Sequence, residues 1–273
     1  MRKIFPAPST APEIGPAGDG DGPPAEAAVA GLATLYAYPD PAAGSAPWVR
    51  ANMVASVDGA GSLDARSGGL SGSADRTLFK VLRSLADVII AGAGTARAER
   101  YRPVREGEVW PQLRQGRTPT PPIAVVTRGL SISADDPLLT SAPQGARTIV
   151  FTTKAAPPAR RAAVARYADL VVTGGDEVSP ADLVAALAER GHRRILVEGG
   201  PTLLGELVTA GLLDELCLTV SPLLEGGHAG RILAGMPGVK PGRDGDGSRC
   251  GLSLGHVLED QGFLFCRYLN VAG

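Results

Sequence analysis

The sequence predicts an α/β protein with a central, mostly parallel sheet, an antiparallel edge and flanking helices. Apolar runs of about five to seven residues alternate with helix-like segments, which is typical of strands buried on both faces of a sheet. The last two strand-like runs, Glu215–Val220 and Gly262–Leu269, have no helix pattern between them and favour antiparallel pairing. The 273 residues suffice for one such domain with a large core.

The elements follow from hydrophobic periodicity and end signals. The earlier expected strands span Trp48–Val54, Asp87–Ala91, Ile123–Thr127, Thr148–Thr152, Asp169–Thr173 and Arg194–Glu198. The expected helices span Asp75–Ala86, Pro158–Tyr167, Ser179–Arg190 and Pro201–Ala210. In the first helix, Leu78, Leu82 and Leu85 share one face at i, i+4 and i+7. Ser179 and Pro180 suit the N-cap and first position of the third.

Composition divides the chain into two parts. Residues 1–28 are rich in Pro, Gly and Ala and have little apolar surface to bury, so we expect a disordered tail. Residues 29–273 are expected to form one domain. Within it, Met236–Cys250 is rich in Gly, Pro and Asp and predicts a flexible hairpin or loop.

Charge and cysteine content exclude several classes of function. The chain has 27 Lys+Arg against 28 Asp+Glu, which gives no electrostatic case for nucleic acid or an anionic membrane as partner. Neither a secretory signal nor an apolar run of the roughly 20 residues that cross a bilayer is present, so we expect a cytoplasmic protein. The three cysteines and three histidines lack zinc-site spacing, and we expect no metal. The chain also lacks the P-loop motif of phosphoryl-transfer enzymes and the GxSxG elbow of hydrolases.

Two glycine turns follow expected strands. In Val88–Thr95, Gly92 and Gly94 can bring a phosphate close to backbone N–H groups, but Arg97 replaces the third glycine of a dinucleotide fingerprint. The residues alone leave open whether this is a ligand site or a plain turn. In Ile195–Leu204, the carboxylate of Glu198 follows a buried strand and precedes a Gly-Gly-Pro turn. The Glu198 carboxylate could face a ligand-binding crevice, or it could accept hydrogen bonds from the N–H groups of the following helix. We favour the crevice.

Two further groups of polar residues are candidates. Asn52, Ser56 and Asp58 alternate along one strand face, and burying them is unfavourable unless they bond each other or a ligand. A strand-ending turn at Asp58-Gly59 is the plainer alternative. Arg83 could reach an anionic substrate group. The arginines of the following loop could do the same or merely be solvated; they are Arg97, Arg100, Arg102 and Arg105.

The order of these motifs resembles the riboflavin-biosynthesis reductases, in the form of the RibD C-terminal domain. The matching segments are Ala55-Ser56-Val57-Asp58-Gly59, Leu82-Arg83, Gly92-Ala93-Gly94-Thr95 with Glu99, and Glu198-Gly199-Gly200-Pro201-Thr202-Leu203. The nearest type is the stand-alone pyrimidine reductase family protein of actinobacteria. The resemblance implies a dihydrofolate reductase-like fold, a homodimer and NADPH as cofactor. It also implies reduction of the ribosyl side chain of 5-amino-6-(5-phosphoribosylamino)uracil to the ribityl form.

The resemblance also implies roles for particular residues. Those expected to contact NADPH are Val54, Ala55, Gly92, Gly94, Thr95, Glu99, Thr127, Gly199, Gly200, Pro201, Thr202, Leu203 and Leu204. Either Thr127 or Arg128 would lie near the adenosine 2′-phosphate. Those expected to contact substrate are Asn52, Ser67, Arg83, Arg102 and Glu198. Asp58 is the expected acidic catalyst, together with Glu198.

One departure leaves the substrate open. Asn52 stands where family members fused to a deaminase usually carry Lys, so the position offers a hydrogen bond and no charge. A reductase of dihydrofolate or another pterin is therefore a second hypothesis, because its ring presents a similar amide edge. A protein that senses NADPH without turnover is a third.

Overall fold

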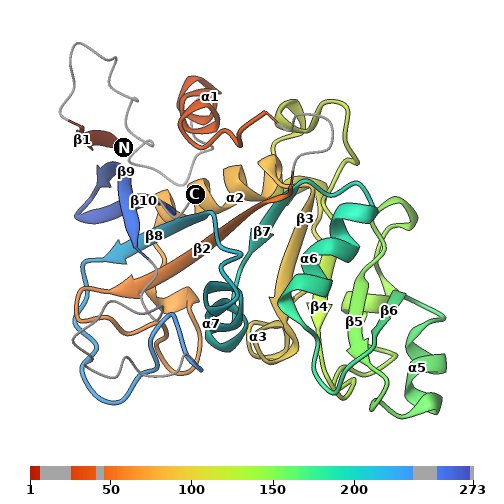
Figure 1. Ribbon diagram of the computed structural model, residues 1–273. Helices are drawn as coiled ribbons and strands as arrows, with labels where there is room; N and C mark the ends of the chain where they lie inside the picture. Colours follow the sequence, from red (N-terminus) through yellow and green to blue (C-terminus); the bar gives the residue numbers. More distant parts are fainter. Residues whose placement is uncertain (7–25, 41–45, 236–250, 271–273) are drawn as a thin grey trace.

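The computed structural model describes residues 1–6, 26–40, 46–235 and 251–270. Their strands form one ten-stranded sheet with helices against both faces (Figure 1). The strands are β1 (Arg2–Phe5), β2 (Trp48–Ser56), β3 (Val88–Gly92), β4 (Ile123–Val126), β5 (Ile149–Thr153), β6 (Asp169–Thr173), β7 (Arg194–Val197), β8 (Glu215–Ser221), β9 (Leu252–Asp260) and β10 (Phe263–Asn270).

The sheet has the order β1-β9-β10-β8-β2-β7-β3-β4-β5-β6. The pairs from β8 through β6 are parallel, whereas β10 pairs antiparallel with β8 and β9, and β1 pairs antiparallel with β9. The predicted α/β class, with its parallel centre and antiparallel edge, is confirmed.

The helices are α1 (Glu26–Leu35), α2 (Ser73–Leu85), α3 (Ala93–Ala98), α4 (Pro137–Thr140), α5 (Pro158–Val164), α6 (Pro180–Glu189) and α7 (Pro201–Thr209). Short 3-10 turns span Gly68–Leu70, Glu106–Glu108, Pro111–Arg114 and Gln144–Ala146. Ser179 caps α6 as expected, because its side chain accepts a hydrogen bond from the N–H of Asp182.

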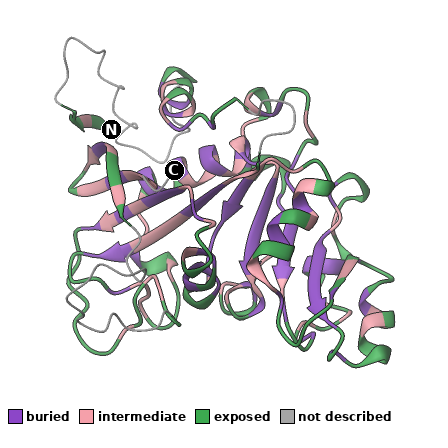
Figure 2. Ribbon diagram, in the orientation of Figure 1, coloured by how far each residue is buried: buried purple, intermediate pink, exposed green. Residues whose placement is uncertain are grey.

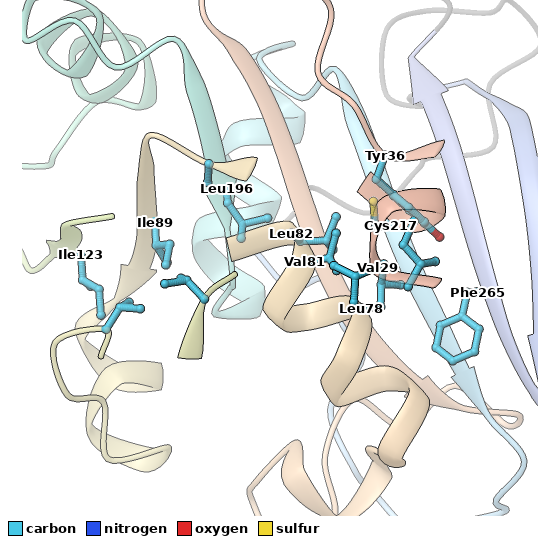
Figure 3. Packing of buried hydrophobic residues seen from close by; sticks show 14 of the residues in the cluster. Val29, Tyr36, Leu78, Val81, Leu82, Ile89, Ile123, Leu196, Cys217 and Phe265 are labelled. Atoms are coloured by element: carbon cyan, nitrogen blue, oxygen red, sulfur yellow. The ribbon is translucent and has the colours of Figure 1, made fainter. Parts of the chain in front are cut away.

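Successive side chains of the central strands point to opposite faces of the sheet, and this divides the core between the two faces. On β3, Ile89 joins the cluster beneath α1 and α2, whereas Val88 and Ile90 join the cluster beneath α6 and α7. The central strands are accordingly buried along their length (Figure 2). Figure 3 shows Leu78 and Leu82 of α2 among the buried side chains of the first cluster.

Several elements were not predicted. Along the chain, the strand β9 lies between the two expected closing strands, α1 begins at Glu26, and α4 spans Pro137–Thr140. The expectation of disorder is wrong for Arg2–Phe5, which forms β1 and extends the sheet beside β9. Residues 7–25 of the expected tail and the expected loop at residues 236–250 lie outside the described residues.

Candidate active site

The carboxyl ends of β2, β3, β4 and β7 meet at one edge of the sheet, where ligands bind in open α/β folds. The two glycine turns are joined there by their backbones. The N–H of Gly92 donates to the carbonyl of Gly199 (2.9 Å), and the N–H of Glu198 donates to the carbonyl of Ile90 (2.9 Å). Two cavities open at this edge, and Thr95 lines both of them.

The first, which we call the Gly200 cavity, has a volume of about 640 Å³ and lies between the two turns and the end of β4. Its lining includes Gly92, Gly94, Thr95, Thr127, Arg128, Gly200, Pro201, Thr202 and Leu203. The helix α7 begins here with Gly200 as its N-cap, and no side chain in the described part of the chain bonds its first N–H groups. Such a helix start favours an anionic group.

The close approach of Gly200 to Thr95 supports a dinucleotide at this position. A Cβ built on Gly200 would collide with the hydroxyl oxygen of Thr95. A glycine is therefore what lets the backbone lie this close to the neighbouring turn, leaving its N–H groups accessible to a phosphate. The residues of the Gly200 cavity fit the phosphates of a nicotinamide dinucleotide. The Gly199–Gly200 peptide is cis.

The second, the Arg83 cavity, has a volume of about 400 Å³ and lies between β2, α2 and the segment that follows α3. It brings together residues that are far apart in the sequence. Among those predicted for the site, it is lined by Asn52, Val54, Ser67, Arg83, Thr95, Glu99, Arg102 and Glu198. The N–H and the hydroxyl of Ser67 both donate to Oε1 of Glu99 (2.7 and 2.9 Å).

Arg83 and Glu198 form a buried ion pair in the wall of this cavity. Nε and Nη2 of Arg83 donate to Oε1 and Oε2 of Glu198 at 2.7 and 2.8 Å, and the side chains are 11% and 2% exposed. The hydroxyl of Tyr101 also donates to Oε2 of Glu198 (2.6 Å). Burial disfavours the charge on Arg83, but Glu198 outweighs it and raises the pKa of Arg83. Burial, followed by Glu198, raises the pKa of Tyr101 and keeps its phenol protonated.

Asp75 is the principal site residue that the sequence analysis missed. It lies in the first turn of α2, is buried, and lines the Arg83 cavity. Its Oδ1 accepts from the Thr219 hydroxyl (2.7 Å) and its Oδ2 from the Ser71 hydroxyl (2.5 Å). A signal was present in the sequence, because Asp75, Phe79 and Arg83 follow the i, i+4, i+8 spacing of one helix stripe and all line the cavity. Tyr101 lies in a loop and had no such signal.

Asp58 does not lie where catalysis was expected. It is absent from the lining of both cavities. Its carboxylate accepts hydrogen bonds from the hydroxyl of Ser56 and from the N–H groups of Glu225 (3.1 Å) and Gly226 (2.7 Å). These bonds, led by that of Ser56, lower its pKa from 3.8 to about 2. A carboxyl group with so low a pKa is a poor proton donor near neutral pH, and the geometry gives Asp58 a role in holding the loop after β8.

Three expected cofactor contacts also lie outside the cavity linings. Ala55 is buried and follows Val54 on β2, so its side chain points to the opposite face of the strand. Leu204 is fully buried in the core beneath α7. Gly199 is buried, and its carbonyl is bonded to Gly92. In the described ranges, no group of three or more His, Cys, Asp or Glu is placed to hold a metal, and no helix has the length and apolar character of a membrane span.

Comparison with known proteins identifies the family. The model of the RibD C-terminal domain matches residues 47–249. The chain is 31% identical to the 2,5-diamino-6-ribosylamino-4(3H)-pyrimidinone 5′-phosphate reductase of Archaeoglobus fulgidus over 185 residues, 67% of this chain and 83% of the relative. It is 28% identical to the protein of the same name from Methanothermobacter thermautotrophicus over 197 residues, 71% of this chain and 86% of the relative.

Solved structures agree with the sequence comparison. A pyrimidine reductase-like protein from Corynebacterium diphtheriae superposes with a TM-score of 0.71 at 25% identity, covering 83% of this chain and 93% of that one. A riboflavin biosynthesis reductase from Saccharomyces shares the fold, with a TM-score of 0.59 at 17% identity, covering 86% of this chain and 93% of that one. The chain belongs to the RibD C-terminal domain family, as its motifs predicted. It is an oxidoreductase of the riboflavin-biosynthesis type.

Proposed function

We propose that the protein uses NADPH to reduce the ribosyl side chain of a phosphoribosylated aminopyrimidine to the ribityl form. The sequence analysis predicts 5-amino-6-(5-phosphoribosylamino)uracil, and the relatives are named for its counterpart with an amino group at ring position 2. The observation that carries the proposal is the meeting of the two cavities at Thr95. A dinucleotide held in the Gly200 cavity would lie beside a substrate in the Arg83 cavity, and such positioning is the main demand of hydride transfer.

The Gly200 cavity supplies the groups that NADPH requires. The phosphates of NADPH would be held by the N–H groups at the start of α7 and by the turn at Gly92–Thr95. Arg128 lines the same cavity, is exposed, and is suited to the adenosine 2′-phosphate that distinguishes NADPH from NADH. When bound, NADPH supplies the hydride that reduces C1′ of the ring-opened sugar.

The Arg83 cavity supplies the groups for the substrate. Because Arg83 is neutralised by Glu198, the substrate phosphate is better matched by the exposed arginines that also line the cavity. These are Arg76, Arg100 and Arg102. We propose that Glu198 acts as a positioning residue, holding Arg83 and Tyr101 against the cavity, and that Ser67 and Asn52 contact the substrate.

We extend two expectations of the sequence analysis to this chain, the homodimer that the family resemblance implies and a cytoplasmic location. Exposed apolar side chains support the first. Val57 and Leu224 are 61% and 80% exposed, and the N–H of Val57 donates to the carbonyl of Leu223 (3.0 Å), which brings the two loops together. A second copy can cover such a surface. Light scattering behind a sizing column measures the mass, and a monomer at micromolar concentration would contradict the homodimer.

The function is tested by supplying the purified protein with NADPH and each phosphoribosylaminopyrimidine, and identifying the product by chromatography and mass spectrometry. We expect a product with two more hydrogen atoms than the substrate and a ribityl chain. Tight NADPH binding without oxidation would favour a sensor instead. Oxidation only with dihydrofolate would favour a pterin reductase.

A further inference from the structure

Asp75 is a buried carboxylate in the wall of the Arg83 cavity. Within the described residues no Lys or Arg forms an ion pair with it, and its recorded partners are the hydroxyls of Ser71 and Thr219. Burying a carboxylate is costly when only neutral donors compensate it. The arrangement is explained if the carboxylate has a further hydrogen-bond donor to meet when substrate is bound.

A carboxylate has about four acceptor positions on its two oxygens, and the two hydroxyls occupy only one on each. The side chain of Asp75 lines the cavity, so its remaining capacity is available to a ligand there. Both oxygens can therefore accept from a ligand that carries two adjacent N–H donors.

A second acceptor lies on the same wall. Among the residues that the structure describes, the buried Oδ1 of Asn52 has no hydrogen-bond donor, and Asn52 lines the cavity. On the paired strands, Val54 lies opposite Thr219, and Asn52 shares the face of Val54. Because Thr219 donates to Asp75, these positions bring the unpartnered Asn52 oxygen to the face of the sheet that Asp75 contacts. Buried acceptors without donors favour a donor-rich ligand edge.

The acceptor positions of Glu198, which the sequence analysis expects to contact substrate, are already occupied. Both of its oxygens accept from Arg83, one also accepts from Tyr101, and its side chain is 2% exposed. Asp75 is the buried carboxylate of this cavity that retains acceptor capacity toward the ligand.

We infer that Asp75, assisted by Asn52, recognises the 2-amino group and the adjacent ring N–H of a 2-amino-4-oxopyrimidine. This inference rests on the proposed function and selects between its two substrates. The 2-amino ring offers two neighbouring donors to the carboxylate. The uracil ring keeps the ring N–H but has a carbonyl oxygen at position 2. That oxygen would face a buried acceptor and leave it without a donor.

The same amino and N–H edge occurs in pterins, so two sources of this chemistry have to be distinguished. The experiment measures kcat and KM with NADPH for three compounds. These are the 2,5-diaminopyrimidinone ribosyl phosphate, its uracil counterpart and dihydrofolate. For the wild type we expect kcat/KM for the diamino compound to exceed that for uracil by at least about tenfold, with dihydrofolate much slower than either.

The Asp75→Asn variant presents an amide in place of the carboxylate. We expect it to raise KM for the diamino compound and to reduce the preference to about unity, because an amide can donate to the uracil carbonyl. The Thr219→Val variant is the matched control for a structural role, since it removes a partner of Asp75 and keeps the carboxylate. It should retain the wild-type preference. The affinity for NADPH, measured in both variants, reports whether the fold is intact.

The outcomes separate the two claims. Reduction of both ribosyl compounds with a preference that Asp75→Asn leaves unchanged would overturn the inference and leave the proposed function standing. Loss of the preference in Thr219→Val as well as in Asp75→Asn would also overturn it. A third outcome is that the wild type turns over dihydrofolate alone and that Asp75→Asn loses this activity. That outcome would support recognition of the amino and N–H edge and would overturn the ribosyl compound as substrate.

Discussion

Arg83 and Glu198 are 115 positions apart in the chain and form a two-point ion pair, with N–O distances of 2.7 and 2.8 Å. Arg83 lies in the last turn of α2, and Glu198 follows β7 directly. The pair therefore joins the helix that forms one wall of the Arg83 cavity to the glycine turn that borders the Gly200 cavity. Planar groups paired in this way fix orientation as well as distance.

The first prediction concerns this pair. Glu198→Gln leaves the buried charge of Arg83 without its partner. We expect the free energy of unfolding to fall by about 3 kcal/mol and turnover to be largely lost, while NADPH affinity stays within a few-fold. Denaturant unfolding, steady-state kinetics and cofactor titration measure the three quantities.

Asp169→Asn is the matched control for Glu198→Gln, because Asp169 pairs with Arg147 at the surface with 54% of its side chain exposed. An exposed ion pair contributes little, so stability and turnover should both be close to wild type. Equal losses in the two variants would show that the Arg83–Glu198 pair has no special role.

The second prediction concerns Gly200. In Gly200→Val the new side chain meets Thr95 and covers the start of α7, so we expect NADPH affinity to fall by about tenfold or more. Gly107→Val serves as control, since an added Cβ there has no atom of the described residues within 4 Å. Titration of both variants followed by nicotinamide fluorescence tests this, and an unchanged affinity in Gly200→Val would mean that the phosphates bind elsewhere.

The third prediction concerns the choice between NADPH and NADH. Arg128 is exposed and lines the Gly200 cavity. In Arg128→Gln we expect KM for NADPH to rise by about tenfold, because a charge-assisted hydrogen bond to the 2′-phosphate is lost, while KM for NADH stays the same. A parallel rise for both cofactors would assign Arg128 to another part of the dinucleotide.

The fourth prediction concerns pH. The hydrogen bonds of Asp58 lower its pKa from 3.8 to about 2, so the ionised form stabilises the fold above pH 4. This contribution is lost as the pH falls through about 2. Near neutrality Asp58 stays ionised and supplies no proton, so Asp58→Asn should leave both limbs of the pH–rate profile in place. A shift of either limb by a full pH unit would return Asp58 to the reaction.

The sequence sufficed to predict the parallel centre of the sheet, because those strands are buried on both faces and their apolar runs are nearly continuous. Two strands at the antiparallel end of the sheet were harder to predict. β1 is four residues long and mostly exposed, and β9 is partly exposed over its first half, so neither carries a long apolar run. Such strands are fixed by pairing with a neighbour rather than by their own hydrophobic pattern.

The residues of the candidate site could also be predicted only in part. The glycine turns and Glu198 were predicted because they lie at strand ends, whose convergence follows from the parallel sheet. The partners of Glu198 could not be derived, since they depend on how α2 and the loop at Tyr101 pack against that edge. The hydrogen bonds of Asp58 could not be predicted, because the spacing of a strand-ending turn resembles that of a polar site and only the fold places Glu225 and Gly226 against it.

The central claim is that a cofactor in the Gly200 cavity passes a hydride to a sugar carbon in the Arg83 cavity. Transfer of deuterium is the most direct measurement. NADPH that carries deuterium on the reactive face of nicotinamide C4 is supplied with the phosphoribosylaminopyrimidine, and the product is examined by NMR. We predict deuterium at C1′ of the ribityl chain. Oxidation of the cofactor with no deuterium at that carbon would contradict the claim.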